Sequence, residues 1–172
     1  MALIVQKFGG TSVGSTERIR NVARRVAKWK AAGHSVVVVP SAMAGETNRL
    51  IALAREIQPQ PEPRELDVVA ATGEQVTIGL LAMALNELGL KAKSYAGWQV
   101  RVHCDSAFGK ARIMSIDDER LRRDIAAGVI PVVAGFQGVD AHENVTTLGR
   151  GGSDTSAVAL AAALKADECQ IY

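Results

Sequence analysis

The 172-residue chain has few aromatic residues and almost no cysteine or histidine. Phe, Trp and Tyr make up 4% of the residues, so the hydrophobic core must be built mainly from Val, Ile, Leu and Ala. The two cysteines, Cys104 and Cys169, and the three histidines do not have the spacing of a metal site. The sequence therefore predicts no protein-bound metal, and two isolated thiols are typical of the reducing cytosol.

A strong charge excess and a long apolar segment are also missing. Twenty basic and 18 acidic residues leave a net charge of +2, which is too small to indicate a nucleic-acid-binding protein. The N-terminus leads directly into a short apolar strand without the pattern of a signal peptide, and the uninterrupted apolar runs are too short to cross a bilayer. We therefore expect a cytoplasmic protein with no nucleic-acid or membrane partner.

Short β-branched runs alternate with helical segments along the whole chain. The predicted strands are residues 3–6, 36–39, 92–95, 129–134 and 169–172, with a hairpin within 100–114. The predicted helices are residues 16–32, 47–57, 64–88 with an interruption at 72–74, 117–127 and 157–164. Four consecutive valines at 36–39 are typical of a strand buried on both faces. The alternation predicts an α/β three-layer sandwich, with a mainly parallel sheet covered by helices.

A glycine-rich loop follows the first predicted strand. Its sequence is Lys7-Phe8-Gly9-Gly10-Thr11-Ser12-Val13-Gly14, and a helix is predicted to begin near Ser15 or Thr16. A strand, a glycine loop and a helix in succession can hold phosphate groups on backbone amides, and Lys7 would place a positive charge beside them. The loop matches neither the P-loop nor the dinucleotide-binding pattern, so a simple tight turn is the alternative.

A second glycine-rich loop lies at Thr147-Leu148-Gly149-Arg150-Gly151-Gly152-Ser153-Asp154. Its glycines let the backbone approach a ligand, and Ser153 is a candidate N-cap for the apolar helix that follows. Arg150 can hold a carboxylate or phosphate with two parallel hydrogen bonds. Asp154 beside such a site indicates a bound cation or a lysine that it orients, and a first-turn acid that favours the helix dipole is the alternative. Since Lys7, Ser41 and this loop all follow predicted strand ends, we expect them to meet at one edge of the sheet.

These motifs resemble those of the aspartate kinases, in the amino-acid kinase superfamily. Residues 7–12 are similar to the opening signature of that family. Three later signatures are similar to Ser41-Ala42-Met43, Thr72-Gly73-Glu74 and residues 149–155, in the same order. The resemblance implies ATP-dependent phosphorylation of the β-carboxylate of L-aspartate to 4-phospho-L-aspartate, the first step towards lysine, threonine and methionine. It also implies Mg²⁺ with the ATP and a homo-oligomeric full-length enzyme.

The resemblance also assigns roles to residues. Lys7 and Asp154 would be catalytic, with Lys7 on the transferring phosphate and Asp154 orienting it. Lys7, Phe8, Gly9 and Gly10 would bind the ATP phosphates. The substrate-binding residues would be Ser41, Thr47, Glu74, Arg150, Gly151, Gly152 and Ser153. Among them, Arg150 would hold the α-carboxylate and Glu74 the ammonium, although a helix-capping acid at Glu74, and ordinary cap or turn residues at Ser41 and Thr47, are the alternatives from the residues alone.

The resemblance covers only the front part of the family's catalytic domain. We expect residues 1–172 to be its N-terminal, substrate-side portion, without the nucleotide-binding half and without regulatory modules. This portion is expected to have little or no kinase activity alone. The alternative functions are a kinase of another small acid such as glutamate, and a catalytically silent substrate-binding or assembly lobe.

Overall fold

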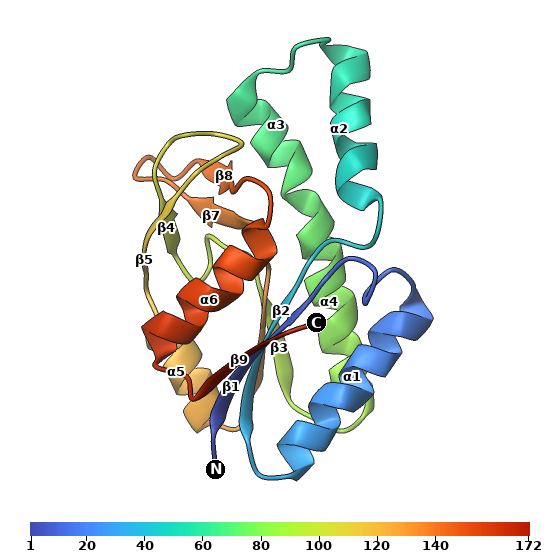
Figure 1. The fold of residues 1–172 in the computed structure, drawn as a ribbon, viewed down its shortest axis with the longest axis vertical. Helices are drawn as coiled ribbons and strands as arrows, with labels where there is room; N and C mark the ends of the chain where they lie inside the picture. The colour runs from blue at the N-terminus through green and yellow to red at the C-terminus, as the bar shows by residue number, and fades with distance from the viewer.

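Two β-sheets of unequal size organise the chain, which a computed structural model describes over residues 1–172 (Figure 1). The larger sheet has five strands in the order β3-β6-β2-β1-β9, and every pairing in it is parallel. Its strands are β1 (Leu3–Phe8), β2 (Ser35–Pro40), β3 (Ala92–Tyr95), β6 (Ile130–Val133) and β9 (Glu168–Ile171). The parallel α/β sheet predicted from the alternating pattern is thus confirmed.

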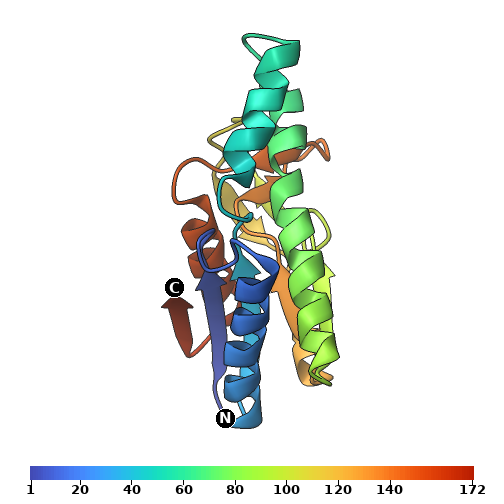
Figure 2. The same cartoon turned by 90° about the vertical axis from the view of Figure 1, so that its right-hand side faces the viewer.

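The larger sheet is covered by helices on both faces (Figures 1 and 2). The helices of the chain are α1 (Thr16–Ala31), α2 (Glu46–Ile57), α3 (Pro63–Ala70), α4 (Thr72–Glu87), α5 (Glu119–Ala126) and α6 (Gly152–Leu164). Helices α1 and α4 pack on one face, and α5 and α6 on the other. Ser15 caps α1, its side chain accepting a hydrogen bond from the Arg18 amide, as the predicted start of this helix requires.

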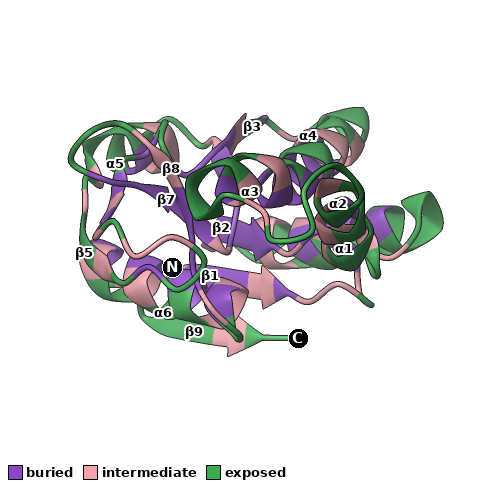
Figure 3. Cartoon of the chain, turned by 90° about the horizontal axis from the view of Figure 1, so that it is seen from above, coloured by how far each residue is buried: buried purple, intermediate pink, exposed green.

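The valine run in β2 explains how one strand serves both layers. Val36 and Val38 belong to the hydrophobic cluster beneath α1 and α4, whereas Val37 and Val39 belong to the cluster beneath α6. All four are almost completely buried, at most 1% exposed. Successive side chains of a strand point to opposite faces, so a strand inside a three-layer sandwich needs an apolar residue at every position. Figure 3 shows β2 buried over most of its length.

A smaller four-stranded sheet lies beside the C-terminal end of the larger one (Figure 1). Its order is β5-β4-β7-β8, with strands β4 (Val102–Cys104), β5 (Ile113–Ile116), β7 (Gln137–Val139) and β8 (Val145–Thr147). The predicted hairpin within 100–114 corresponds to the antiparallel pair β4 and β5. Strands β7 and β8 were not predicted, because strands of three residues are too short to show a periodic pattern.

Helices α3 and α4 form an almost continuous helical stretch. Only Ala71 separates them, and its backbone is itself in the helical region. The interruption predicted at 72–74 is wrong, because these residues form the first turn of α4. By length and hydropathy alone, Pro63–Glu87 could cross a membrane, since an 18-residue window within it has a mean hydropathy of 1.6. The polar residues within this segment interrupt its apolar runs, so the expectation that no run could cross a bilayer did not cover it. Half of the apolar window is buried inside the protein, where Ile78, Leu81 and Leu85 belong to the core.

Candidate functional site

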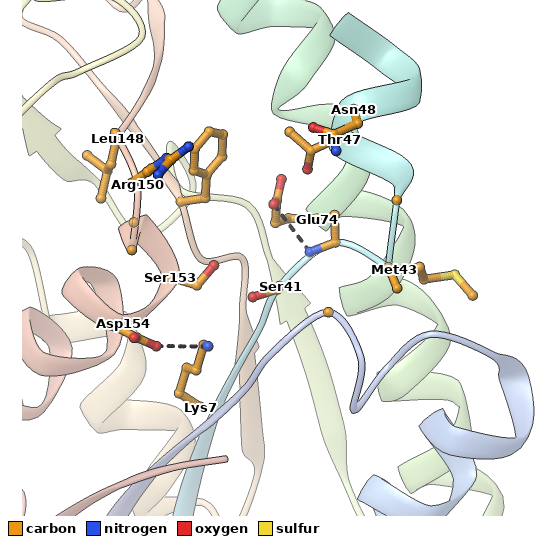
Figure 4. A pocket seen from close by; sticks show the side chains of 18 of the residues that line it. Lys7, Ser41, Met43, Thr47, Asn48, Glu74, Leu148, Arg150, Ser153 and Asp154 are labelled. Atoms are coloured by element: carbon orange, nitrogen blue, oxygen red, sulfur yellow. Dashed lines mark hydrogen bonds and ion pairs between the residues drawn. The ribbon is translucent and has the colours of Figure 1, made fainter. Parts of the chain in front are cut away.

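A cleft of about 490 Å³ opens where β1, β2 and β8 end and where α2, α4 and α6 begin. Parallel sheets bind ligands at the carboxyl ends of their strands, and helix N-termini attract anions. Figure 4 shows the side chains that line this cleft. The predicted site residues among them are Lys7, Gly10, Ser41, Thr47, Glu74, Arg150, Gly151, Gly152, Ser153 and Asp154. The structure thus brings together residues that lie up to 147 positions apart in the sequence.

An ion pair forms the floor of the cleft. The Lys7 ammonium lies 2.8 Å from Oδ1 of Asp154, with the Lys7 side chain 12% exposed and that of Asp154 47% exposed (Figure 4). Lys7 is the penultimate residue of β1, and Asp154 lies in the first turn of α6. The pairing that the sequence analysis anticipated is therefore present in the protein. The half-exposed carboxylate leaves the lysine accessible from the cleft.

The glycine loop after β1 reaches the cleft through Gly10 but not through Phe8 or Gly9. Phe8 is buried in the core and stacks on Tyr172, and the Gly9 amide donates to the Tyr172 carbonyl at 3.0 Å. Phe8 and Gly9 thus lie outside this cleft, and their assignment to the ATP phosphates stays a prediction. The Gly10 amide has no acceptor in the chain, and a Cβ there would lie 3.2 Å from the Ala42 carbonyl oxygen. Close approach of the two loops therefore accounts for Gly10.

The second glycine loop presents a row of free amide donors. None of the six successive amides from Gly149 to Asp154 donates to an acceptor in the chain. Gly151, with φ of 71°, is the N-cap of α6, so Ser153 lies inside the first turn and the prediction of Ser153 as N-cap is wrong. Glycine takes this cap position because it adopts a left-handed backbone without strain. The Ser153 side chain is instead directed into the cleft, between the ion pair and Glu74 (Figure 4).

Glu74 is a buried carboxylate with one oxygen unpaired. It is 2% exposed, and its Oε1 accepts a hydrogen bond from the Ala42 amide at 3.3 Å, whereas its Oε2 has no partner. Burial raises the pKa of Glu74 from 4.5 to about 7, although the backbone amides of Glu74 and Ala42 act in the opposite direction. A cationic donor at Oε2 would satisfy this oxygen and favour the charged form.

Gly73 explains how Glu74 comes so close to the loop after β2. A Cβ at Gly73 would lie 2.9 Å from the Ala42 side chain, so only glycine lets the start of α4 approach that loop. Thr47, at the start of α2, lies on the opposite side of Glu74 from Arg150 (Figure 4). Arg150 is exposed and forms no ion pair within the chain. An unpaired carboxylate and an unpaired guanidinium thus face the same cleft.

Phe136 is a cleft residue that the sequence analysis missed. Its φ of 71° is rare for a bulky residue, and two hydrogen bonds hold it. The Phe136 amide donates to Oγ of Ser156 at 3.0 Å, and its carbonyl accepts from the Leu148 amide at 2.8 Å. A Cβ at Gly152 would lie 2.9 Å from the Phe136 ring, which explains that glycine. In the sequence, the glycines Gly135 and Gly138 on either side of Phe136 were the signal that could have indicated an unusual backbone near the cleft.

No group of three or more His, Cys, Asp or Glu side chains is arranged to hold a metal ion. The donors in the cleft are instead free backbone amides, the unpaired Arg150 guanidinium and the Lys7 ammonium that is paired with Asp154, all of which suit anions. The buried Glu74 is the exception, and it suits a cation. The cleft can therefore hold a ligand with two or more negative groups and one positive group.

Three comparisons with known proteins all find amino acid kinases. The model of the amino acid kinase family matches residues 2–172. The chain is 68% identical over 172 residues to an aspartokinase of Pseudomonas aeruginosa, covering 100% of this chain and 42% of that protein. It thus spans less than half the length of this curated relative.

Solved structures of related enzymes superpose on almost the whole chain. An aspartate kinase from Synechocystis matches with a TM-score of 0.86 and 51% identity, covering 99% of this chain and 28% of that one. Aspartokinase III of E. coli, in complex with aspartate and ADP, matches with a TM-score of 0.87 and 26% identity, covering 99% of this chain and 48% of that one.

Proposed function

This chain belongs to the amino acid kinase family, and we propose that within this family it is the N-terminal, substrate-side portion of an aspartate kinase. The proposed parent reaction transfers the γ-phosphoryl group of ATP to the β-carboxylate of L-aspartate, which yields 4-phospho-L-aspartate. The similarity to aspartokinases over the full chain supports the substrate assignment. In this proposal, the nucleotide-binding half and any regulatory modules lie outside residues 1–172.

One observation carries the proposal: the unpaired Oε2 of Glu74 and the unpaired Arg150 face the same cleft. An α-amino acid carries an ammonium and a carboxylate on one carbon. Glu74 would accept the ammonium, and Arg150 would hold the α-carboxylate with two parallel hydrogen bonds. Ser41, Thr47 and Ser153 would supply hydroxyl groups to the remaining oxygens, with the amides of Gly151 and Gly152 beside them. An aspartate side chain would then extend towards Lys7.

The floor of the cleft would serve the phosphoryl group. Phosphoryl transfer depends mainly on alignment and on neutralising negative charge. Lys7 would stabilise the transferring phosphoryl group, and the free Gly10 amide would donate to the same oxygens. Asp154 would hold Lys7 in position through the 2.8 Å ion pair. A carboxylate nucleophile is already ionised at neutral pH, so the reaction needs no general base.

ATP would enter as its magnesium complex. Mg²⁺ commonly keeps several waters and is held by nucleotide phosphates with one or two carboxylates, which agrees with the absence of a preformed metal cluster here. The proposal extends to a cytoplasmic enzyme on the route to lysine, threonine and methionine that is homo-oligomeric at full length, as the resemblance implies. We expect residues 1–172 alone to release ADP at a rate far below that of a full-length enzyme.

Calorimetric titration of residues 1–172 with L-aspartate tests the substrate assignment. We expect binding by the wild-type chain and its loss in Arg150→Ala, because the α-carboxylate then loses its partner. Arg55→Ala, on an exposed arginine of α2 outside the cleft, is the matched control. Succinate, which lacks the ammonium, should bind more weakly than aspartate, and L-glutamate tests the length of the side-chain pocket. Tighter binding of glutamate than of aspartate would overturn the assignment.

A further inference from the structure

Asp67 is a buried carboxylate that the proposed function does not use. It lies on α3, is 1% exposed and forms no ion pair. Its Oδ1 accepts a hydrogen bond from the Thr147 hydroxyl at 2.7 Å. Its Oδ2 accepts from the Thr147 amide at 2.8 Å and from the Gly109 amide at 3.0 Å. A charge buried without a counter-ion persists only when such donors compensate for lost hydration.

The hydrogen bonds of Asp67 join two sides of the cleft. Thr147 is the last residue of β8, three positions before Arg150, and Gly109 itself lines the cleft. Asp67 lies seven residues before Glu74, which is about two helical turns along the nearly continuous α3–α4 stretch. Figure 1 shows α3 beside β8. Asp67 therefore links the helix that carries Glu74 to the strand that leads to Arg150.

The loop between Thr147 and α6 has little else to hold it. The amides from Gly149 to Asp154 find no acceptor in the chain, and the Arg150 side chain has no ion-pair partner. At the beginning of the loop, the Leu148 amide donates to the Phe136 carbonyl at 2.8 Å. A loop without internal hydrogen bonds takes its position from its ends. At the N-terminal end of this one, the Thr147 carbonyl accepts from the Ala111 amide at 3.0 Å and Leu148 is buried in the core, while the Thr147 amide and hydroxyl both donate to Asp67.

We propose that Asp67 is a positioning residue for the amino-acid substrate, and that through Thr147 it sets the placement of the Arg150 guanidinium relative to Oε2 of Glu74. This inference rests on the proposed function, since it takes these two groups to hold the ammonium and α-carboxylate of one molecule. Both substrate groups are attached to the same carbon, so the two subsites must keep a fixed separation. A small displacement of either weakens both interactions together.

Two neighbouring threonines provide a matched pair of variants. Thr147→Val removes the hydroxyl that donates to Asp67 but leaves the backbone and the size of the side chain nearly unchanged. Thr146→Val removes a hydroxyl that is equally buried in the same strand but forms no hydrogen bond to Asp67. Asp67→Ala removes all three hydrogen bonds. In Asp67→Asn the amide oxygen can accept from both backbone amides while its nitrogen donates to the Thr147 hydroxyl, so this variant should restore the link.

Aspartate titration and amide hydrogen exchange of residues 148–154, both on folded variants of the 172-residue chain, test the proposal. We expect Asp67→Ala to raise the Kd for aspartate about tenfold and Thr147→Val about threefold, with faster exchange of this segment in both. Asp67→Asn and Thr146→Val should stay close to wild type in both measurements. If Asp67→Ala does not fold, the affinity and exchange of Thr147→Val test the proposal instead.

The two measurements separate this inference from the proposed function. If the wild-type chain binds aspartate, and Thr147→Val has a lower melting temperature but unchanged affinity and exchange, Asp67 is only structural and the inference is wrong. If the wild-type chain binds no aspartate, the substrate assignment fails. In that case only the amide hydrogen exchange of residues 148–154 tests the link between Asp67 and the loop. An unchanged exchange rate in Thr147→Val would overturn that link.

Discussion

The charged groups on the floor of the cleft, Lys7 and Asp154, are paired differently from those on its wall, Glu74 and Arg150. On the floor, Lys7 and Asp154 are paired with each other at 2.8 Å. On the wall, Glu74 keeps one oxygen unpaired in a buried position, and Arg150 has no ion-pair partner. The floor group is held ready by its own partner, whereas the wall groups are left open for a ligand. The unpaired buried oxygen of Glu74 costs stability, whereas Arg150 is exposed; under the proposed function, the ammonium of the substrate would compensate for the cost at Glu74.

Removing the lysine of the floor should have the largest effect. We expect Lys7→Met to lower kcat about 10²–10³-fold with little change in the KM for aspartate, because its charge is needed mainly in the transition state. The measurement uses a chimera in which residues 1–172 replace the matching segment of the Pseudomonas aeruginosa aspartokinase. Lys28→Met on the exposed face of α1 is the control. A loss in Asp154→Asn larger than that in Lys7→Met would contradict an orienting role for Asp154.

On the wall, Glu74→Gln should stabilise the fold at high pH while weakening aspartate binding. A carboxyl whose pKa is raised by folding contributes stability below its unfolded value of 4.5, and this contribution is lost as the pH rises through about 7. The difference corresponds to about 3 kcal/mol at most. Denaturant unfolding should therefore show Glu74→Gln more stable than wild type at pH 8 and nearly equal at pH 4. Equal stabilities at pH 8 would show that burial costs the ionised Glu74 nothing.

The affinity for aspartate should itself depend on the protonation of Glu74. Since the carboxylate form accepts the ammonium, we expect the Kd to rise about tenfold between pH 8 and pH 6, as the group with pKa about 7 becomes protonated. No histidine lines the cleft, and free aspartate does not titrate in this range. Titrations at several pH values should give a sloping profile for wild type and a flat one for Glu74→Gln. A sloping profile in the variant would assign the dependence to another group.

Alanine substitutions at two glycines of α4 should change the unfolding free energy least, and in opposite directions. Gly73→Ala places a methyl group 2.9 Å from the Ala42 side chain, so we expect a loss of about 1–2 kcal/mol in unfolding free energy and weaker aspartate binding. Gly79→Ala meets no atom within 4 Å and should stabilise the helix by about 0.5–1 kcal/mol without changing affinity. Thermal unfolding and titration of both variants check this. Similar effects at the two positions would show that the wall is not closely packed at Gly73.

Much of the larger sheet could be predicted because its signals are local. The valine run of β2 and the helical spacing of Val22 and Val26 in α1 are periodic patterns that burial on a sheet requires. The strands β7 and β8 carry no such pattern, since each has three residues and is defined by its neighbours. The N-cap of α6 was predicted at Ser153 but lies at Gly151. The backbone takes its left-handed turn at Gly151, and residue type alone favoured the serine.

The alternation of the longer strands and helices, the two glycine loops and the residue types within these loops follow from the sequence by itself, because each depends on neighbours a few positions apart. Only the tertiary structure decided that the Gly9 amide is used by Tyr172, that one oxygen of Glu74 stays unpaired, and that Asp67 bonds to Thr147. The two hydrogen bonds join residues 80 or more positions apart, and the unpaired oxygen reflects burial by distant segments. The free energy of a buried polar group depends on its partners, and packing alone supplies them.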